Sequence, residues 1–274
     1  MSLLKKFFVS SKEEDNQLPP LHLAALIDDY ERVKLIIEDD ISAVEALDEM
    51  DKKPLHYAAK NGNFRIVKLL LENNAEIDPF DKEQITPLHL ASNAGHIETV
   101  KLLLEKNAKT DPVDKKLRTP LHLASNGGHK EIVKMLLEKN AKIDPKNINN
   151  HTPLHLAASN GDFGIVKILI AYDENQAAIN SKDNKIWTPL HYAVSKNNIK
   201  ITNLLLNHKA EIVMNDQMHT PLHIAALGGH KEIAKILIDH MAKINLLDKE
   251  NWSVLNTSLS EKNIAELFYI IPPL

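Results

Sequence analysis

The sequence predicts an all-helical repeat protein, an α-solenoid of about eight helix-turn-helix units. Two observations support this fold class: a tripeptide that recurs at a nearly constant interval, and helical spacing of apolar residues within each interval. Pro-Leu-His occurs seven times in 274 residues, and successive prolines are 34, 33, 33, 33, 36 and 32 residues apart. The seven prolines are Pro20, Pro54, Pro87, Pro120, Pro153, Pro189 and Pro221. A fixed period of this length is typical of solenoids, because each small unit buries its apolar face only against its neighbours.

Each unit is predicted to contain two helices, as the third copy illustrates. Thr86 is a candidate N-cap residue, and Pro87 suits the first position of a helix that ends at Gly95. Apolar residues after this glycine recur at the spacing of a second helix, namely Val100, Leu103 and Leu104. The polar stretch 111–119 then leads to the next Thr-Pro.

The repeats use nearly the whole chain, which predicts one elongated domain over residues 18–274 and a short N-terminal arm over residues 1–17. A degenerate copy of the motif at 252–256, with Val254 in the proline position, provides the eighth unit. The first and last units are expected to act as caps. At the front, Asp28 and Asp29 replace the Gly-His pair of later units. At the back, apolar residues at i, i+3, i+4 and i+7 suit a closing helix, namely Ile264, Leu267, Phe268 and Ile271.

Composition excludes several classes of protein. The chain has no cysteine, which excludes disulfides and thiolate metal sites and suits a reducing compartment. No apolar run approaches the roughly 18 residues of a membrane span, and the N-terminus lacks the apolar region of a signal peptide. We therefore expect a cytoplasmic monomer with no membrane span.

Charge argues against a nucleic-acid partner. The net charge is −4, and arginine occurs only at positions 32, 65 and 118. One lysine recurs in the same position of six units: Lys34, Lys68, Lys101, Lys134, Lys167 and Lys235. Five of these lysines are followed four residues later by an acid, at positions 38, 72, 105, 138 and 239. Such pairs face each other on a helix and cancel locally, so this stripe is predicted to be a solvated helix face.

The repeated pattern closely resembles the ankyrin repeat over about residues 18–271. Thr-Pro-Leu-His begins at Thr86, Thr119, Thr152, Thr188 and Thr220, and the glycine between the helices is Gly62, Gly95, Gly128, Gly161 and Gly229. An Asp or Asn opens the connecting hairpin at positions 48, 81, 114, 147, 183, 215 and 248. The resemblance implies an ankyrin-type α-solenoid, in which a short β-hairpin connects each pair of antiparallel helices to the next.

Three departures from the ankyrin pattern affect local structure. The glycine usual three residues before the repeat proline is replaced by Asp51, Gln84, Leu117, Asn150, Ile186 and Met218, so the hairpin tips are expected to be less regular. Asparagine replaces glycine at the end of the second helix in three units (positions 74, 107 and 140), a left-handed position that asparagine can fill. The insertion 171–176 is expected to bulge from one edge or to lengthen a helix.

The fourteen histidines invite a metal or catalytic interpretation, which their positions disfavour. Seven belong to Pro-Leu-His, and three follow the repeat glycine. Equivalent side chains in neighbouring repeats are about 10 Å apart, too far to share a metal bound at about 2 Å. A structural role is therefore predicted for these ten, and the remaining four, His151, His208, His219 and His240, are expected to be exposed. No phosphate-binding loop, His-Glu-x-x-His pair or nucleophile elbow occurs, so we predict a protein that is not an enzyme and needs no cofactor.

The resemblance implies partner binding on the concave face, through hairpin tips and the exposed ends of the first helices. The position two residues before the repeat proline holds, from the third unit on, Ile85, Arg118, His151, Trp187, His219 and Trp252. Neighbouring tip residues are Lys82, Glu83, Lys115, Lys116, Asn149, Lys185 and Gln217, and first-helix residues are Lys60, Asn93, Asn126, Ser159, Ser195 and Leu227. Tryptophan and arginine often dominate interface energetics. The alternative for the bulky tip residues is packing against the adjacent hairpin.

The predicted function is that of a non-catalytic adaptor that binds a protein partner. The alternative is a bacterial effector, secreted into a host cytosol, that modulates a host protein through the same surface. Thirty lysines against three arginines suggest an AT-rich genome, and stand-alone ankyrin proteins of this composition resemble those of intracellular bacteria. In that case residues 260–274 would carry the export signal. An enzyme is the remote third class.

Overall fold

The structure is a computed structural model that describes the backbone of residues 18–247 and the side chains of residues 18–240. The chain divides after Lys115 into two compact units. The predicted arm at 1–17, Trp252, the degenerate eighth copy and the apolar stripe at 264–271 lie outside the described residues. No helix in the described part of the chain is long and apolar enough to cross a membrane.

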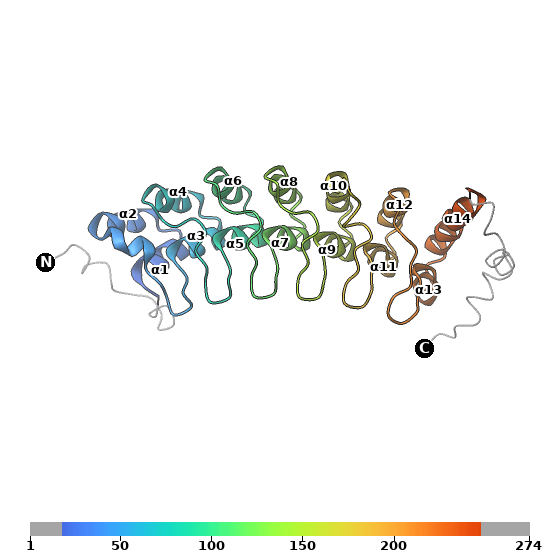
Figure 1. Cartoon of the computed structure of the whole chain (residues 1–274). Helices are drawn as coiled ribbons and strands as arrows, with labels where there is room; N and C mark the ends of the chain where they lie inside the picture. Colours follow the sequence, from blue (N-terminus) through green and yellow to red (C-terminus); the bar gives the residue numbers. More distant parts are fainter. Residues whose placement is uncertain (1–17, 248–274) are drawn as a thin grey trace. The chain divides into compact units, whose positions relative to one another are not determined.

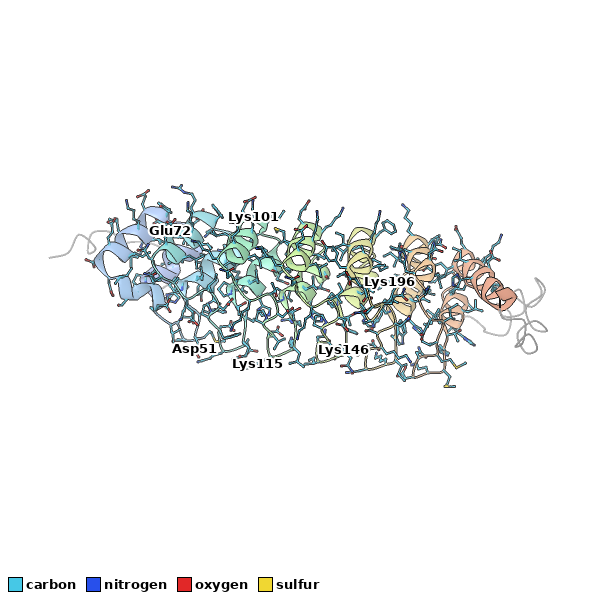
Figure 2. The ribbon with its side chains drawn as sticks, turned by 45° about the horizontal axis from the view of Figure 1, so that its top comes forward. Asp51, Glu72, Lys101, Lys115, Lys146 and Lys196 are labelled. Atoms are coloured by element: carbon cyan, nitrogen blue, oxygen red, sulfur yellow. The ribbon has the colours of Figure 1, made fainter. Side chains whose placement is uncertain are left out.

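The first unit contains three antiparallel helix pairs. In chain order its elements are α1 (Pro20–Leu26), α2 (Tyr30–Asp39), the 3₁₀ helix η3 (Ile41–Glu45), α3 (Pro54–Asn61), α4 (Phe64–Glu72), α5 (Pro87–Ala94) and α6 (Ile97–Glu105). First helices α1, α3 and α5 pack side by side in one row, and second helices α2, α4 and α6 form the other (Figure 1). Asp51 and Lys115 lie at the loop edge of this unit, whereas Glu72 and Lys101 lie on its second-helix side (Figure 2).

The second unit repeats this arrangement with four helix pairs. Its elements are α7 (Pro120–Asn126), α8 (Lys130–Glu138), α9 (Pro153–Asn160), α10 (Phe163–Tyr172), α11 (Pro189–Ser195), α12 (Ile199–Asn207), α13 (Pro221–Leu227) and α14 (Lys231–Leu247). First helices α7, α9, α11 and α13 form one row, and second helices α8, α10, α12 and α14 form the other. The helix-turn-helix prediction is thus confirmed for seven units.

The Thr-Pro-Leu-His motif begins five of the first helices with a reciprocal capping box. In α9, the Thr152 hydroxyl caps the backbone N–H of His155 (3.5 Å), and His155 Nδ1 accepts the N–H of Thr152 at 3.1 Å. Proline fits the next position because its missing N–H would have no helical partner there. The same box occurs in α5, α7, α11 and α13. In α1 the threonine position is Pro19, which has no N–H, and His22 Nδ1 has no hydrogen-bond partner.

Left-handed residues separate the helices as predicted. The five repeat glycines have φ between 68° and 82°, and Asn74, Asn107 and Asn140 have φ between 61° and 65° at the ends of second helices. A side chain at Gly62 would also collide with the His96 ring, 2.4 Å from the ideal Cβ position. His96 Nε2 instead donates to the Lys60 carbonyl at 2.9 Å, so this glycine allows a ring of the next repeat to approach.

The connecting hairpins are regular turns with no extended strand among the residues described. The loops opened by Asp48, Asp81, Asn147, Asp183 and Asn215 are closed by a backbone hydrogen bond from the opening residue to the tip residue four positions later, as in Asp183 N–H to Trp187 O at 2.9 Å. The expected irregularity is not found, because all six replacements of the usual glycine adopt the same left-handed conformation, with φ from 54° to 62°. Regularity is therefore kept at the cost of backbone strain at these residues.

The core runs between the two rows of helices in each unit. In the second unit, Leu121, Leu136, Leu154 and Leu169 are among the largest fully buried side chains. The insertion at 171–176 both lengthens a helix and bulges. Helix α10 gains one residue over α8, and the buried Asp173 then accepts the backbone N–H groups of residues 177, 178 and 179 at 2.9–3.2 Å.

Candidate functional site

The predicted contact residues occupy the loop tips and first helices of both units, and most are exposed. The exposed ones are Lys60, Lys82, Glu83, Asn93, Lys115, Lys116, Asn126, Asn149, Lys185, Gln217 and Leu227. The half-buried ones are Ile85, Arg118, His151, Ser159, Trp187, Ser195 and His219. The position two residues before the proline is thus consistently half-buried, which distinguishes it from the exposed tip residues beside it.

Each loop is held by the carboxylate or amide that opens it. Asp183 Oδ1 accepts the N–H groups of Lys185 and Trp187, each at 2.8 Å. Asp48, Asp81, Asn147 and Asn215 make the same pair of bonds in their own loops. A short polar side chain is required here, because only it can return to the backbone two and four residues later. The tips are therefore preorganised.

Neighbouring loops are tied together by the backbone. In the second unit, the N–H groups of residues 148, 184 and 216 donate to the carbonyls of residues 116, 149 and 185, each at 3.1 Å. The repeat histidines add a second tie. His155 Nε2 lies 3.1 Å from the carbonyl oxygen of Trp187, and because Nδ1 already accepts an N–H, Nε2 carries the proton and donates. This confirms the structural role predicted for the Pro-Leu-His series.

Trp187 packs against the first helix of its own repeat. Its ring centroid lies 5.1 Å from that of Tyr192 and 5.8 Å from that of His191, both on α11. The ring remains half-buried, so part of its surface faces solvent. The contacts support packing as one role of this side chain, and the exposed remainder leaves surface for a partner.

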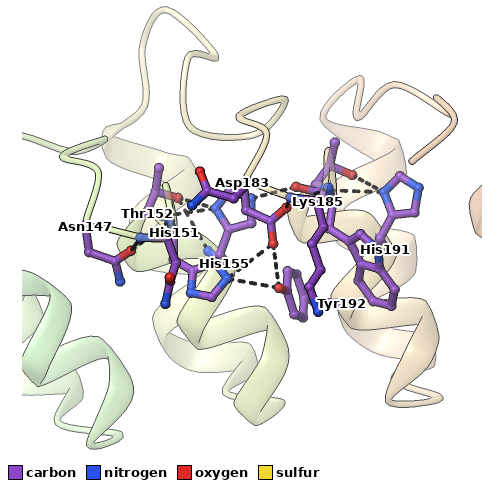
Figure 3. Close-up of polar contacts among 12 residues, drawn as sticks. Asn147, His151, Thr152, His155, Asp183, Lys185, His191 and Tyr192 are labelled. Atoms are coloured by element: carbon purple, nitrogen blue, oxygen red, sulfur yellow. Dashed lines mark hydrogen bonds and ion pairs between the residues drawn. The ribbon is translucent and has the colours of Figure 1, made fainter. Parts of the chain in front are cut away.

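A polar cluster lies between the His151 tip and the next repeat (Figure 3). The Tyr192 hydroxyl donates to Asp183 Oδ2 at 2.7 Å, and His151 Nε2 lies 3.2 Å from the same oxygen and 3.0 Å from the hydroxyl. The carboxylate can only accept, so His151 Nε2 is a donor. His151, which we expected to be exposed, is half-buried, as are His219 and His240, whereas His208 is exposed.

The electrostatics of the cluster follow from these bonds. Burial raises the pKa of Asp183, but hydrogen bonds from the Tyr192 hydroxyl and the Trp187 and Lys185 amides outweigh it and hold the pKa below its ordinary value. Burial and the neighbouring carboxylate raise the pKa of Tyr192, because both disfavour a phenolate. Asp183 is an ionised side chain with four donors, which suits an organiser of the loop better than an acid or base.

The described residues do not form a cluster of metal ligands. Between residues 18 and 240, no group of three or more histidine or carboxylate side chains is placed to hold an ion. In His56, His122 and His155 both ring nitrogens are engaged in hydrogen bonds, whereas Nδ1 of His22 and Nε2 of His191 are buried without a partner.

Sequence reasoning missed Asp183 and Tyr192 as members of the site. A signal was present: tyrosine follows the motif histidine in only two repeats, at Tyr57 and Tyr192, and each stands nine residues after a loop-opening aspartate. In the first unit the Tyr57 hydroxyl likewise donates to Asp48 Oδ2, at 2.6 Å. A tyrosine nine residues after the loop-opening aspartate therefore marks the two loops in which a tyrosine hydroxyl donates an extra hydrogen bond to that aspartate.

Comparison with known proteins agrees with this architecture. The crystal structure of the human ASB11 ankyrin repeat domain matches with a TM-score of 0.68 and 29% sequence identity, over 76% of this chain and 92% of that chain. No curated protein matches the sequence. The family model described as ankyrin repeats (3 copies) matches residues 2–81, 77–147, 144–216 and 213–270. Because these matches extend over most of the chain, the protein belongs to the ankyrin-repeat family.

Proposed function

We propose that this protein is a non-catalytic adaptor that binds a protein partner through the loop tips and first helices of its second unit. Ankyrin repeats are generic protein–protein interaction modules, which gives the broad class. The observation that carries the specific proposal is Trp187, an aromatic ring fixed on Tyr192 with part of its surface facing solvent. Fold alone would not identify a site, so the argument depends on this side chain and its surroundings.

The surroundings of Trp187 favour binding because little has to be ordered. The loop backbone is held by Asp183 and tied to the loops on either side. A surface fixed in advance avoids part of the entropic cost of association. Lys185 is exposed on the same tip, Asn149 and Gln217 are exposed on the tips before and after it, and His219 holds the equivalent position one repeat further on. Such an aromatic anchor with a polar rim resembles the hot-spot arrangement of protein interfaces.

The remaining tip and first-helix residues extend the proposal. In the second unit, these are Lys116, Arg118, Asn126, His151, Ser159, Ser195 and Leu227; in the first unit, Lys60, Lys82, Glu83, Ile85, Asn93 and Lys115 form an equivalent surface. Trp252 is proposed on its sequence position alone. A standard interface of roughly 1,600 Å² needs only some of these residues.

The proposal is tested by partner capture followed by affinity measurements on purified variants. A partner isolated with the wild-type protein is produced separately, and its Kd is measured for Trp187→Ala, Lys185→Ala and wild type. We expect Trp187→Ala to weaken binding by about 2 kcal/mol or more, roughly thirtyfold. Lys185→Ala, which removes an exposed neighbour without a scaffold contact, should weaken it less. Lys235→Ala on the second-helix side is the control and should bind like wild type.

Melting curves of the same variants separate binding from packing. Trp187→Ala also removes the contact with Tyr192, so some loss of stability is expected with either role. Unchanged affinity per folded molecule, with only a lower melting temperature, would show that Trp187 is a scaffold residue and would remove the basis of the proposal.

The place of action has two candidates. We propose that the protein acts as a cytoplasmic monomer, and the alternative is an effector delivered into a host cell through a signal in residues 260–274. The lysine-rich composition favours the alternative, as it suggests an AT-rich genome. A reporter fusion measured for translocation with and without residues 260–274 decides between them. Light scattering of the purified protein tests the monomer.

A further inference from the structure

A groove runs between two second helices of the second unit, on the side away from the loop tips. Helices α8 and α10 pack side by side, and the space between their outer faces measures about 720 Å³. Its wall on α10 is the stripe Gly164, Lys167, Ile168 and Ala171, at i, i+3, i+4 and i+7. Lys130 and Lys134 of α8 line the other side.

The groove exists because α10 departs twice from the repeat. Gly164 occupies the second position of the helix, where the other units carry long charged side chains: Glu31, Arg65, Glu98, Glu131, Lys200 and Glu232. Ala171 occupies the position that holds an acid in five units: Glu38, Glu72, Glu105, Glu138 and Asp239. Both replacements lie on one face of α10, seven residues apart, which is two helical turns. Two side chains that would fill the groove are thus missing from the same surface.

The same departures leave the groove positively charged. Lys134 pairs with Glu138 at 3.5 Å on its own helix, as Lys34 and Lys68 pair with their acids. Lys167 has Ala171 at the equivalent position, so that pair cannot form. Three lysines and one glutamate line the groove. The stem of Lys130 lies across Gly164, with its Cδ 3.4 Å from where a Cβ would stand.

Aromatic side chains close the two ends of the stripe. Phe163, at the first residue of α10, is 39% exposed, and Tyr172, at the last, is 40% exposed. They are nine residues apart along the helix, about 13 Å along its axis. Both line the groove, and Ile168 is half-buried in its wall. The surface therefore combines an apolar floor, aromatic ends and a lysine rim.

We propose that the α8–α10 groove is a second docking site, which takes an acidic amphipathic helix from a partner protein. A helix fits because Gly164, Ile168 and Ala171 form a floor that runs along α10 for two turns, the geometry in which an apolar stripe enters a groove between helices. Acidic side chains on its flanks would meet Lys130, Lys134 and Lys167. This site is independent of the tips, so the protein could hold two partners at once.

The test uses a synthetic helix-forming peptide of leucine and glutamate, with leucines recurring at every third and fourth position. A matched peptide carries lysine in place of every glutamate. Binding of each labelled peptide to the full-length protein is measured by fluorescence anisotropy at low and moderate salt. We expect the acidic peptide to bind and its affinity to fall with salt, while the lysine peptide does not bind.

Two variants restore the ordinary repeat residues and should close the groove. Gly164→Glu and Ala171→Glu each place an acid among the lysines, and each is expected to weaken the acidic peptide at least tenfold. Neither should unfold the protein: Gly164 has an ordinary helical φ with only a flexible lysine nearby, and glutamate favours a helix more than glycine does. Asn207→Glu is the matched control, since it makes the same charge change at the position of Ala171 in the next repeat. It should bind like wild type.

The proposal is overturned if the acidic peptide does not bind, or if Gly164→Glu and Ala171→Glu bind it as well as wild type does. It is also overturned if inorganic polyphosphate or single-stranded RNA binds wild type and the acidic peptide does not compete, because the lysines would then serve a polyanion. Loss of peptide binding in Trp187→Ala would contradict the independence of the two sites.

Discussion

His155 Nε2 donates a hydrogen bond across 3.1 Å to the carbonyl oxygen of Trp187, 32 residues later in the chain. The imidazole is buried, and its neutral form is required because the other ring nitrogen accepts an N–H. The equivalent bonds of His22 to Lys52, of His56 to Ile85 and of His122 to His151 place one neutral imidazole between successive loops. These histidines therefore link the stability of the repeats to pH.

We predict that stability falls as the pH drops below about 6.5. Burial, the largest influence, lowers the pKa values of His22, His56 and His191, and lowers that of His155 to about 4. Between pH 6.5 and 4 the unfolded chain binds protons that the folded chain excludes, so the stability present above pH 6.5 is lost as the pH falls. His155 alone accounts for about 3 kcal/mol of this loss. Urea unfolding across this pH range checks it. A flat profile would contradict the buried neutral imidazoles, and His208→Ala should leave the profile unchanged.

Pro19→Thr should stabilise the first repeat. The substitution supplies the hydroxyl and the N–H that the other capping boxes have, and it gives the buried His22 Nδ1 a donor. An added N-cap is worth about 1 kcal/mol. Thermal melting, with hydrogen exchange localising the gain to α1, provides the measurement. Pro19→Ala is the control, since it restores the N–H without the hydroxyl, and it should recover only part of the effect.

Ile186→Gly should also stabilise the protein, although glycine usually weakens a chain. Ile186 is held at φ 57°, where a β-branched residue is strained by about 1–2 kcal/mol. Relief of this strain exceeds the added entropy of the unfolded chain, about 0.5–1 kcal/mol. The net gain is about 1 kcal/mol in urea unfolding. Ile148→Gly, at an exposed loop isoleucine whose φ is not positive, should instead destabilise.

Leu136→Ala should cost about 2–5 kcal/mol. The Leu136 side chain is fully buried in the second unit, so truncation leaves a cavity between its two rows of helices. Met135→Ala on the same helix, at a half-buried position, should cost less. Chemical unfolding of both variants tests the order. Equal and negligible losses would be incompatible with a core at this position.

Chelation should leave the melting temperature unchanged. In the boxes of α3, α7 and α9, Nδ1 of His56, His122 and His155 accepts a backbone N–H and Nε2 donates to a carbonyl, so neither nitrogen of these rings offers a free lone pair. Melting with and without EDTA, together with elemental analysis of the purified protein, checks this. Stoichiometric zinc whose removal destabilises the protein would overturn the structural interpretation of the histidines.

The sequence by itself determined the repeat, the boundaries of its helices and the residues that cap each helix. These features depend on contacts within one unit: the Thr152–His155 box spans three residues, and Gly161 needs its left-handed conformation for a turn between adjacent helices. Both features depend on neighbours in the sequence and each occurs in five repeats, so the pattern could be recognised without knowing how the units stack.

Only the tertiary structure decided which side chains meet at the tips and on the outer faces. His151 contacts Tyr192, 41 residues later, and the carboxylate of Asp183, and the α8–α10 groove brings Lys130 of one repeat next to Gly164 of the following one. The sequence shows that Lys167 lacks the acid four residues later that other repeats have. Only the structure shows that this position faces α8 and contributes to the groove. Side chains from different repeats meet only when the units stack, and the period alone does not state which individual side chains then face each other.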